Sequence, residues 1–224
     1  DYRYVSSGKI VVREAVDGEV LTTLDGNVRN LKAGMLVIAD DERAIGLAGI
    51  MGGENSEIMD DTTTVVFESA NFNGTCIRKG ALALGMRTEA SAKFEKGLDI
   101  LNTLPAVNRA CELVEMLGAG EVLDGVIDIL NYVPQPTVLT LEPKKINALL
   151  GTDVSDEEMV RILKSVGFEV EGDQVTVPSW RATKDVTIKA DIIEEITRIY
   201  GYDNFEIFTS KSALAPVRKE IQKS

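Results

Sequence analysis

Asn131-Tyr-Val-Pro-Gln-Pro136 is the stretch that sets the organisation of this chain. Its two prolines, two residues apart, favour extended backbone and disfavour both a helix and the interior of a sheet. At about 150 residues per domain, a chain of 224 residues has room for two domains of unequal size. We therefore expect a first domain over residues 1–132, a linker over 133–136, a second domain over 137–205 and a tail over 206–224.

Upstream of the linker, short apolar runs separated by turn residues predict β-strands. The dipeptide Asp25-Gly26 favours a tight turn and so predicts a hairpin. The continuous apolar run within 63–69 is typical of a strand that is buried on both faces. Apolar residues at three- and four-residue spacing, with glycines just beyond them, predict a helix over 104–117. The other expected elements are strands at 9–14, 20–24, 35–39, 44–48 and 121–129, and a helix at 75–84.

Downstream of the linker, the pattern changes to helices around one hairpin. Ser155 and Glu158 have the spacing of a capping box and precede an apolar stripe at helical spacing. Gly172-Asp173 predicts the turn of a hairpin over 168–177, and spaced isoleucines predict a final helix over 187–200. The fold class that we expect is α+β, with a mixed sheet and packed helices in the first domain and a small winged-helix-like α/β second domain.

Composition excludes several classes of function. The chain contains no histidine, which excludes imidazole general bases, Ser-His-Asp and Cys-His nucleophiles, and histidine metal sites. Its 24 basic and 36 acidic residues give a net charge of −12, which repels a nucleic-acid backbone. RNA would therefore have to be held locally or by another polypeptide. No apolar run approaches the roughly 20 residues of a membrane span, so we expect no membrane association.

The cysteines and the first residues bear on the cellular compartment of the chain and on whether it is part of a longer protein. Cys76 and Cys111 are far apart in the sequence, which fits a reducing compartment better than a disulfide scaffold. The chain begins Asp-Tyr-Arg-Tyr-Val, without a methionine or the features of a signal peptide. We expect it to be an excised piece of a longer cytoplasmic protein.

Glycines punctuate the segment 44–55, at positions 46, 49, 52 and 53. Glycine lets backbone approach a ligand closely, but the segment matches neither a P-loop nor a dinucleotide-binding pattern. A tight corner between a strand and a loop is the favoured interpretation, and a phosphate-binding loop is the alternative.

Two polar features could belong to a binding site. Glu68 interrupts an apolar run, and a carboxylate there needs either an ion-pair partner or a ligand. Residues 87–97 mix small and charged side chains without clear periodicity, which favours a solvated loop, with a binding loop as the alternative.

Four carboxylates gather near the last predicted helix: Asp185, Asp191, Glu194 and Glu195. The last three stand at i, i+3 and i+4 and so share one side of the helix. Together the four could hold a hard cation such as Mg²⁺. The alternative is a solvated face that pairs with Lys184, Lys189 and Arg198.

Five segments carry a distinctive pattern in a fixed order. They are the glycine-rich segment at 46–54, Val-Phe-Glu-Ser-Ala-Asn-Phe at 66–72, Arg-Thr-Glu-Ala-Ser-Ala-Lys-Phe-Glu-Lys-Gly-Leu-Asp at 87–99, Pro-Ser-Trp-Arg at 178–181 and Asp-Ile-Ile-Glu-Glu-Ile-Thr-Arg-Ile-Tyr-Gly-Tyr-Asp-Asn at 191–204. In these segments the chain resembles the β subunit of bacterial phenylalanyl-tRNA synthetase. The resemblance covers about residues 1–205.

The resemblance implies an editing domain over 1–132, which hydrolyses tyrosine wrongly esterified to phenylalanine tRNA, and a winged-helix-like domain over 137–205. It implies that Glu68 reads the tyrosine hydroxyl, that Gly52 lines the pocket and that Thr88 and Ala90 shape its wall. It also implies that a positioned water, helped by the ribose hydroxyl, attacks the ester. The family carries a His-Ala-Phe-Asp segment, and we expect Asp1 to be its aspartate.

For the second domain the resemblance implies that the four carboxylates, Asp185, Asp191, Glu194 and Glu195, hold a Mg²⁺ shared with an α subunit. It also implies an α2β2 enzyme that binds tRNA(Phe) and places ATP-dependent aminoacylation in the α subunit. Three hypotheses follow: an editing hydrolase module, a non-catalytic docking and RNA-binding element, and a metal-dependent hydrolase that uses the four carboxylates.

Overall fold

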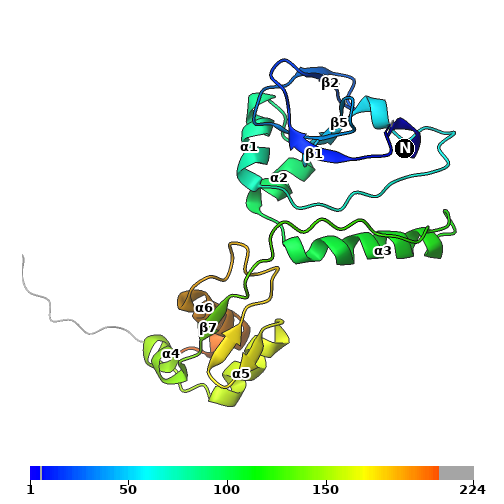
Figure 1. The fold of residues 1–224 in the computed structure, drawn as a ribbon. Helices are drawn as coiled ribbons and strands as arrows, with labels where there is room; N and C mark the ends of the chain where they lie inside the picture. Colours follow the sequence, from blue (N-terminus) through cyan, green and yellow to red (C-terminus); the bar gives the residue numbers. More distant parts are fainter. Residues whose placement is uncertain (6, 207–224) are drawn as a thin grey trace, which may run out of the picture. The chain divides into compact units, whose positions relative to one another are not determined.

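Figure 1 shows the computed structural model of the chain, which describes residues 1–5 and 7–206. By its internal contacts the chain divides into two units. The first unit is Asp1–Thr137 together with Val177–Thr187, and the second is Val138–Thr176 with the described residues from Ile188 onward. The segment 177–187, expected in the second domain, thus groups with the first unit. Of the expected tail, only Glu206 lies within the described residues.

An antiparallel sheet forms the centre of the first unit, and it confirms three of the strands that the sequence predicts there. The strands run in the order β1-β4-β5-β6. A separate hairpin pairs β2 with β3 around Asp25-Gly26, as predicted. The bounds are β1 Val11–Glu14, β2 Val20–Thr22, β3 Val28–Asn30, β4 Leu36–Ala39, β5 Ala44–Leu47 and β6 Met51–Gly52. Short 3-10 turns lie at Tyr2–Tyr4, Glu54–Ser56 and Ile100–Asn102 in this unit and at Tyr202–Asn204 in the other.

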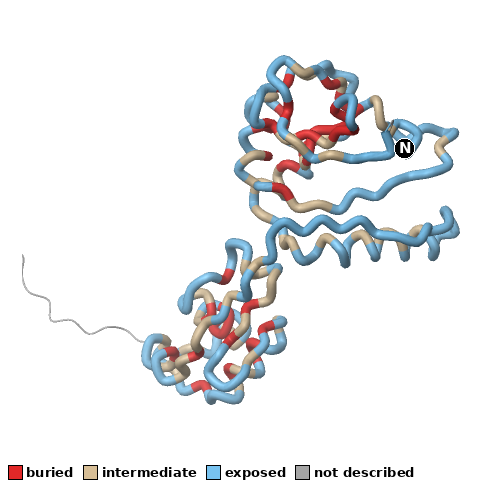
Figure 2. Tube along the Cα trace, in the orientation of Figure 1, coloured by how far each residue is buried: buried red, intermediate tan, exposed pale blue. Residues whose placement is uncertain are grey.

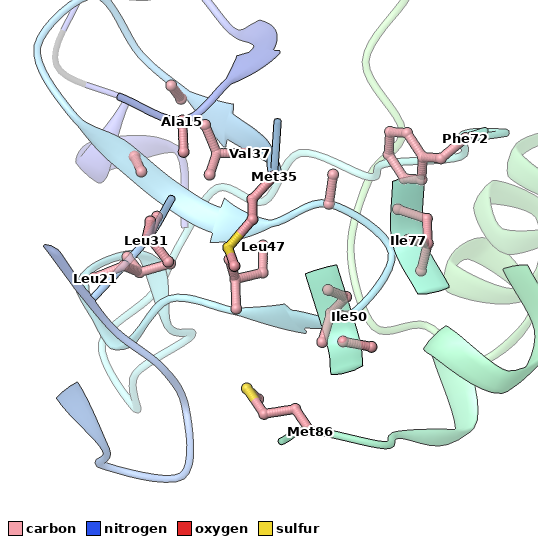
Figure 3. Close-up of a cluster of buried hydrophobic side chains, with 14 residues drawn as sticks. Ala15, Leu21, Leu31, Met35, Val37, Leu47, Ile50, Phe72, Ile77 and Met86 are labelled. Carbon is pink, nitrogen blue, oxygen red and sulfur yellow. The ribbon is translucent and has the colours of Figure 1, made fainter. Parts of the chain in front are cut away.

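Two helices complete the core of the first unit. Helix α1, Gly74–Ala83, begins where the Asn73 side chain accepts hydrogen bonds from the amides of Thr75 and Cys76. Helix α2, Glu89–Lys96, packs against α1. Figure 3 shows the resulting apolar cluster, in which Ile77 of α1 lies with side chains of the sheet. The cluster includes Leu21, Leu31, Met35, Val37, Leu47, Ile50, Phe72 and Met86.

Helix α3, Thr103–Met116, confirms the helix predicted at 104–117. None of its residues is buried, and Figure 2 shows half-buried and exposed residues alternating along it. Its apolar stripe is covered only in part, since Val107, Ala110, Cys111 and Val114 are half-buried. Leu104, Leu113 and Met116 are exposed by 42%, 39% and 67%.

Two predicted strands are wrong. Residues 63–69 and 121–129 are assigned to no strand, although both are apolar. Val66 and Phe67 are exposed by 51% and 48%, and Ile127 by 94%. A β-strand forms only where a neighbouring strand completes its backbone hydrogen bonds. Apolar content alone does not provide such a neighbouring strand. The prediction that 63–69 is buried on both faces fails for the same reason.

The sequence favours a loop at 87–97, and this prediction is also wrong. Thr88 caps α2 by accepting a hydrogen bond from the amide of Ser91, and the Ser91 hydroxyl accepts one from the amide of Thr88. This reciprocal cap, with Gly97 at the other end, defines a helix whose small residues give little apolar periodicity.

The second unit confirms the predicted helices and hairpin. The Ser155 hydroxyl accepts a hydrogen bond from the amide of Glu158, as a cap should, while the Glu158 carboxylate binds Arg161. Its sheet has the order β7-β9-β8. The bounds are β7 Val138–Thr140, α4 Pro143–Leu150, α5 Asp156–Ser165, β8 Glu169–Glu171, β9 Gln174–Thr176 and α6 Lys189–Tyr200. Its buried side chains include Met159, Ile162, Leu163, Val175, Ile192 and Ile196.

The α+β class is confirmed, since helices pack with separate small sheets. All strand pairings of the described residues are antiparallel rather than mixed in direction. The winged-helix likeness of the second unit stays a prediction. Within 1–5 and 7–206, no helix is both long and apolar enough to cross a membrane.

Candidate functional site

The glycine-rich segment forms the tight turn between β5 and β6, so the corner interpretation is confirmed. Gly49 has a φ of +65°, a left-handed conformation that favours glycine. A Cβ at this position would lie 3.1 Å from side-chain atoms of both Phe72 and Phe94. The turn therefore lies directly on the aromatic part of the core, where no room is left for a side chain.

Thr88 connects α2 to this turn. Its hydroxyl donates a hydrogen bond to the carbonyl of Ile50 at 2.8 Å and accepts one from the amide of Ser91 at 3.1 Å. Gly52 follows two residues after Ile50 and pairs with Gly46. Leu24 packs closely on it, because an added Cβ would lie 3.1 Å from the Leu24 Cδ1. The described contacts thus bring Thr88 and the Gly52 strand to one turn.

Ala90 lies in the first turn of α2 and is exposed. It follows Thr88, the N-cap of this helix, by two residues. Three of the four predicted pocket residues therefore lie on or beside the two elements that the Thr88 hydroxyl joins.

Glu68 lies in the extended segment that follows Asp61 and is exposed. Among the described residues, its carboxylate has no hydrogen-bond or ion-pair partner, so the ion-pair alternative is not realised there. Partial shielding of the carboxylate by surrounding protein raises the pKa of Glu68 above its usual range. No hydrogen bond or ion pair among the described residues joins Glu68 to Gly52, Thr88 or Ala90.

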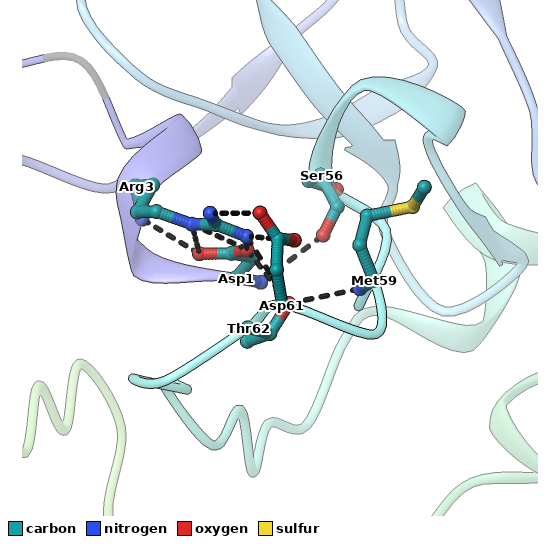
Figure 4. A network of polar contacts seen from close by, with 6 residues as sticks. All are labelled: Asp1, Arg3, Ser56, Met59, Asp61 and Thr62. Carbon is teal, nitrogen blue, oxygen red and sulfur yellow. Dashed lines mark hydrogen bonds and ion pairs between the residues drawn. The ribbon is translucent and has the colours of Figure 1, made fainter.

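Hydrogen bonds on either side hold the Glu68 segment in place. The Ser69 hydroxyl donates to the carbonyl of Thr103 at 2.7 Å, and the Asn71 amide donates to the carbonyl of Leu98 at 2.7 Å. Upstream, Arg3 binds the carboxylates of both Asp1 and Asp61, as Figure 4 shows. This network was not predicted, because the sequence gives no sign that residues 58 positions apart are neighbours.

Three of the four carboxylates near α6 are engaged, each with a different partner. Asp191 accepts a hydrogen bond from the amide of Ile188 at 2.9 Å, which caps the helix. Glu195 is buried and pairs with Arg198 at 2.8 Å. Asp185 pairs with Arg181.

A preformed metal site is therefore not supported. The described part of the chain holds no group of three Asp, Glu or Cys residues that could bind a metal ion. The three engaged carboxylates serve as a helix cap or as ion-pair partners of arginines, and Glu194 is exposed on α6. The solvated-face alternative is met in part: Arg198 pairs as expected, whereas Lys189 pairs with Glu142.

Two cavities lie among the described residues of the first unit. One, of about 440 Å³, is lined by residues that include Arg43, Glu54 and Asn55. The other, of about 350 Å³, is lined by residues of α1 and α2 and by Lys184. Neither lining includes the predicted pocket residues. The second cavity was not predicted, although the pair Arg78 and Lys79 on one face of a predicted helix was a visible signal.

Residues 1–119 match the family model described as the B3/4 domain. The chain belongs to the B3/4 domain family. Beyond this B3/4 match, residues 139–202 match the tRNA synthetase B5 domain. The two matched ranges fall on either side of the proline-containing segment 131–136.

Two relatives of this B3/4 chain have the same name, and each matches most of its length. The phenylalanine–tRNA ligase β subunit of Clostridium acetobutylicum is 42% identical over 214 residues, which is 95% of this chain and 27% of the relative. That of Bacillus subtilis is 41% identical over 208 residues, 91% of this chain and 26% of the relative. The chain thus spans about a quarter of the length of these relatives.

A solved structure was also found for this B3/4 chain. It is an N-terminal fragment of the phenylalanyl-tRNA synthetase β subunit from Pyrococcus horikoshii, with a TM-score of 0.46 and 15% identity. The match covers 87% of this chain and 56% of that one.

Proposed function

We propose that this chain is the editing part of a phenylalanine–tRNA ligase β subunit, which hydrolyses tyrosyl esters formed wrongly on tRNA(Phe). The observation that carries the proposal is the B3/4 match over 1–119 in a chain whose relatives are named as this β subunit. Charging of tRNA with phenylalanine would belong to the assembled enzyme, and this chain would supply proofreading.

Glu68 is the residue proposed to discriminate tyrosine from phenylalanine. Its carboxylate has no partner among the described residues, so it is available to accept a hydrogen bond from a phenol. The shielding that raises its pKa makes it a stronger acceptor, because the hydrogen bond forms in a less aqueous environment. Phenylalanine would leave this carboxylate unpaired, and that desolvation penalty excludes it.

Gly52, Thr88 and Ala90 are proposed to shape the pocket. A side chain at Gly52 would crowd Leu24, since an added Cβ would lie 3.1 Å from its Cδ1, so glycine would be needed at this part of the pocket wall. The hydroxyl of Thr88 is engaged by the cap and by Ile50, so Thr88 would act by positioning the N-terminus of α2 rather than by touching the reacting atoms. Ala90 offers a small side chain on that same turn.

The proposed hydrolysis needs little from the protein's side chains. An aminoacyl ester is already reactive, and holding it beside one water converts a bimolecular attack into a nearly unimolecular one. A hydroxyl of the substrate's ribose would orient the water. This fits a chain with no histidine.

The partners follow from the relatives' name and are part of the proposal. We expect an α subunit, in an α2β2 assembly, and tRNA(Phe). A Mg²⁺ shared with that α subunit would be held by Asp185, Asp191, Glu194 and Glu195. Asp185, Asp191 and Glu195 would first have to leave their present contacts. Because three of these carboxylates are already engaged, we derive no catalytic step through a metal.

A second candidate function is a non-catalytic docking element. The observation in its favour is the exposed apolar surface of α3 and of the segment after it, where Leu117, Leu123 and Ile127 are exposed by 78%, 77% and 94%. Exposed apolar side chains that gather in one part of a chain are a feature of surfaces that a partner covers.

Calorimetric titration with tyrosine and with phenylalanine tests the proposed function. We expect tyrosine to bind and phenylalanine to bind at least about tenfold more weakly, the ratio that loss of one hydrogen bond to a charged group produces. Glu68→Gln should remove most of this preference while keeping the size of the side chain.

Asp60→Asn is the matched control, because Asp60 is another exposed carboxylate of the same connecting segment. It should leave the preference for tyrosine intact. Equal binding of both amino acids by the unaltered chain, together with no hydrolysis of tyrosyl-tRNA by a full-length β subunit that carries this segment, would exclude the editing proposal.

A further inference from the structure

A concave surface beside α1 carries positive charge in a chain that is acidic overall. The cavity of about 350 Å³ is lined by Arg78 and Lys79 of α1 and by Lys184, with Glu95 as the carboxylate of its lining. Three cations therefore face one anion, whereas the whole chain has 24 basic and 36 acidic residues. The local charge is opposite in sign to the net charge of the molecule.

The cations of this cavity are not neutralised within the described part of the chain. Arg78 and Lys79 form no hydrogen bond or ion pair there. The Lys184 ammonium donates to a backbone carbonyl, that of Glu95, at 3.4 Å. The Glu95 carboxylate itself lies 3.7 Å from the guanidinium of Arg87, outside the cavity lining. The positive charge is therefore available to a ligand.

The fold builds the cavity from the start of α1 and the end of α2. At Gly74, an added Cβ would lie 2.6 Å from the carbonyl oxygen of Phe94, so α1 can begin this close to α2 only with glycine. Arg78 and Lys79 lie one turn further along and are exposed, whereas Ile77 and Ala81 are buried. Because the lining includes the first turn of α1, the positive end of the helix dipole adds to the charge of the side chains.

We propose that this cavity, the α1 cavity, binds phosphate groups of an RNA strand. An arginine fork and two lysine ammonium groups around a concavity match the size and charge of phosphate oxygens. The choice of RNA as the source of the phosphate rests on the proposed function, in which the ester is carried on RNA. The net charge of −12 repels RNA, and the α1 cavity would supply a local positive charge that attracts its phosphate groups.

Binding of a short fluorescent single-stranded RNA to the full chain, followed by anisotropy over a range of salt concentrations, tests the α1 cavity. Arg78→Glu with Lys79→Glu should weaken RNA binding by at least about tenfold. The slope of log affinity against log salt should fall by about 0.7 for each phosphate group that the variant no longer binds. Lys184→Ala should weaken binding less, in the same direction.

Lys32→Glu is the matched control, since Lys32 is an exposed lysine of the same unit with no ion-pair partner among the described residues. It changes the net charge by the same amount per residue but lies outside the α1 cavity. Equal RNA affinity in the α1 variants and this control would overturn the proposal, and so would a lack of RNA binding by the unaltered chain at low salt. Circular dichroism confirms that each variant is folded.

Inorganic phosphate separates the two sources of the ligand. If free phosphate binds and its binding is abolished in the α1 variants while RNA affinity is unchanged, the ligand is phosphate and the RNA proposal is wrong. Tyrosine titration of the same variants separates this proposal from the editing proposal. If the α1 variants lose RNA binding but still bind tyrosine, both the editing proposal and the RNA proposal are supported. If they lose RNA binding and the unaltered chain does not bind tyrosine either, only the RNA proposal is supported.

Discussion

Glu68 carries a carboxylate that surrounding protein partly shields from water, and the shielding raises its pKa. In the unfolded chain this group titrates near its ordinary value of 4.5. Ionised Glu68 is therefore less stable in the folded chain than in the unfolded chain at neutral pH. The role proposed for Glu68 in binding tyrosine would therefore come with some loss of fold stability.

Glu68→Gln is accordingly expected to raise the melting temperature at neutral pH. The rise should be small, below about 2 °C, because the carboxylate is only partly shielded from water. The difference between variant and parent should shrink as the pH falls through the raised pKa of Glu68 and vanish below 4.5, where the unfolded chain is also protonated. Thermal melts at several pH values measure this, and a variant that is less stable at neutral pH would contradict it.

Thr88 provides a second test at the residue scale, through the hydroxyl that joins α2 to the β5–β6 turn. Thr88→Ala removes both the helix cap and the bond to Ile50. We expect a loss of about 1–2 kcal/mol in the free energy of unfolding, measured by urea denaturation. Thr88→Ser keeps the hydroxyl and should recover most of the loss; equal destabilisation by both changes would assign the effect to the methyl group instead.

At the scale of elements, Glu142 holds two helices of the second unit together. Its carboxylate pairs with Lys145 of α4 at 2.5 Å and with Lys189, the first residue of α6, at 2.7 Å. Hydrogen bonds from these lysines lower the pKa of Glu142 from 4.5 to about 2. The folded chain therefore binds this proton less tightly than the unfolded chain does.

Acidification should weaken these two ion pairs. The contribution of Glu142 to stability is complete above pH 4.5 and is lost as the pH falls towards 2. Glu142→Gln should remove that part of the acid sensitivity, so the stability curves of variant and parent converge at low pH. Denaturation midpoints across this range measure it. Parallel curves at all pH values would show that the two ion pairs do not stabilise the fold.

Ile196 tests the packing of α6, since its side chain is fully buried. Ile196→Ala should lower the free energy of unfolding by about 2–5 kcal/mol, because apolar packing is removed and a cavity is left behind. Ile199→Ala, at a position exposed by 37%, is the matched control and should cost much less. Similar losses at both positions would mean that α6 buries a different face.

The helices could be predicted where their buried faces repeat along the chain, as at Met159, Ile162 and Leu163 of α5. Helix α2 could not, because it is held by the reciprocal cap of Thr88 and Ser91 rather than by an apolar stripe. The apolar run at 63–69 wrongly predicted a strand, because a strand also needs a neighbouring strand, which its own residues do not specify. The elements that depend on distant contacts are those that the sequence did not reveal.

The candidate site was harder to predict than the fold. Glu68 stood out as a carboxylate in an apolar run, but its lack of a partner among the described residues could be seen only in three dimensions. The four acidic residues near α6 looked like one cluster by their spacing, yet Asp191 caps a helix and Glu195 binds Arg198. Spacing along a helix shows which side chains share a face; it does not show which are already engaged.

At the scale of the whole molecule, these engaged carboxylates predict the response to metal ions. We expect Mg²⁺ to leave the melting temperature of this chain unchanged apart from a general ionic effect on a molecule of net charge −12. Differential scanning calorimetry with Mg²⁺, and with NaCl at matched ionic strength as the control, measures this. A rise specific to Mg²⁺ that Glu194→Gln abolishes would show that a metal site forms after all.

The segment Val177–Thr187 belongs to the first unit, although all three strands of the second unit's described sheet and two of its helices precede it in the sequence. One of its interactions is the hydrogen bond from the hydroxyl of Ser179 to the carboxylate of Asp99, 80 residues earlier. During synthesis on a ribosome, which adds about 5–20 residues per second, the first unit therefore waits several seconds for its last piece. Until then, Asp99 lacks its hydrogen bond from Ser179, while the intervening residues emerge and begin to fold.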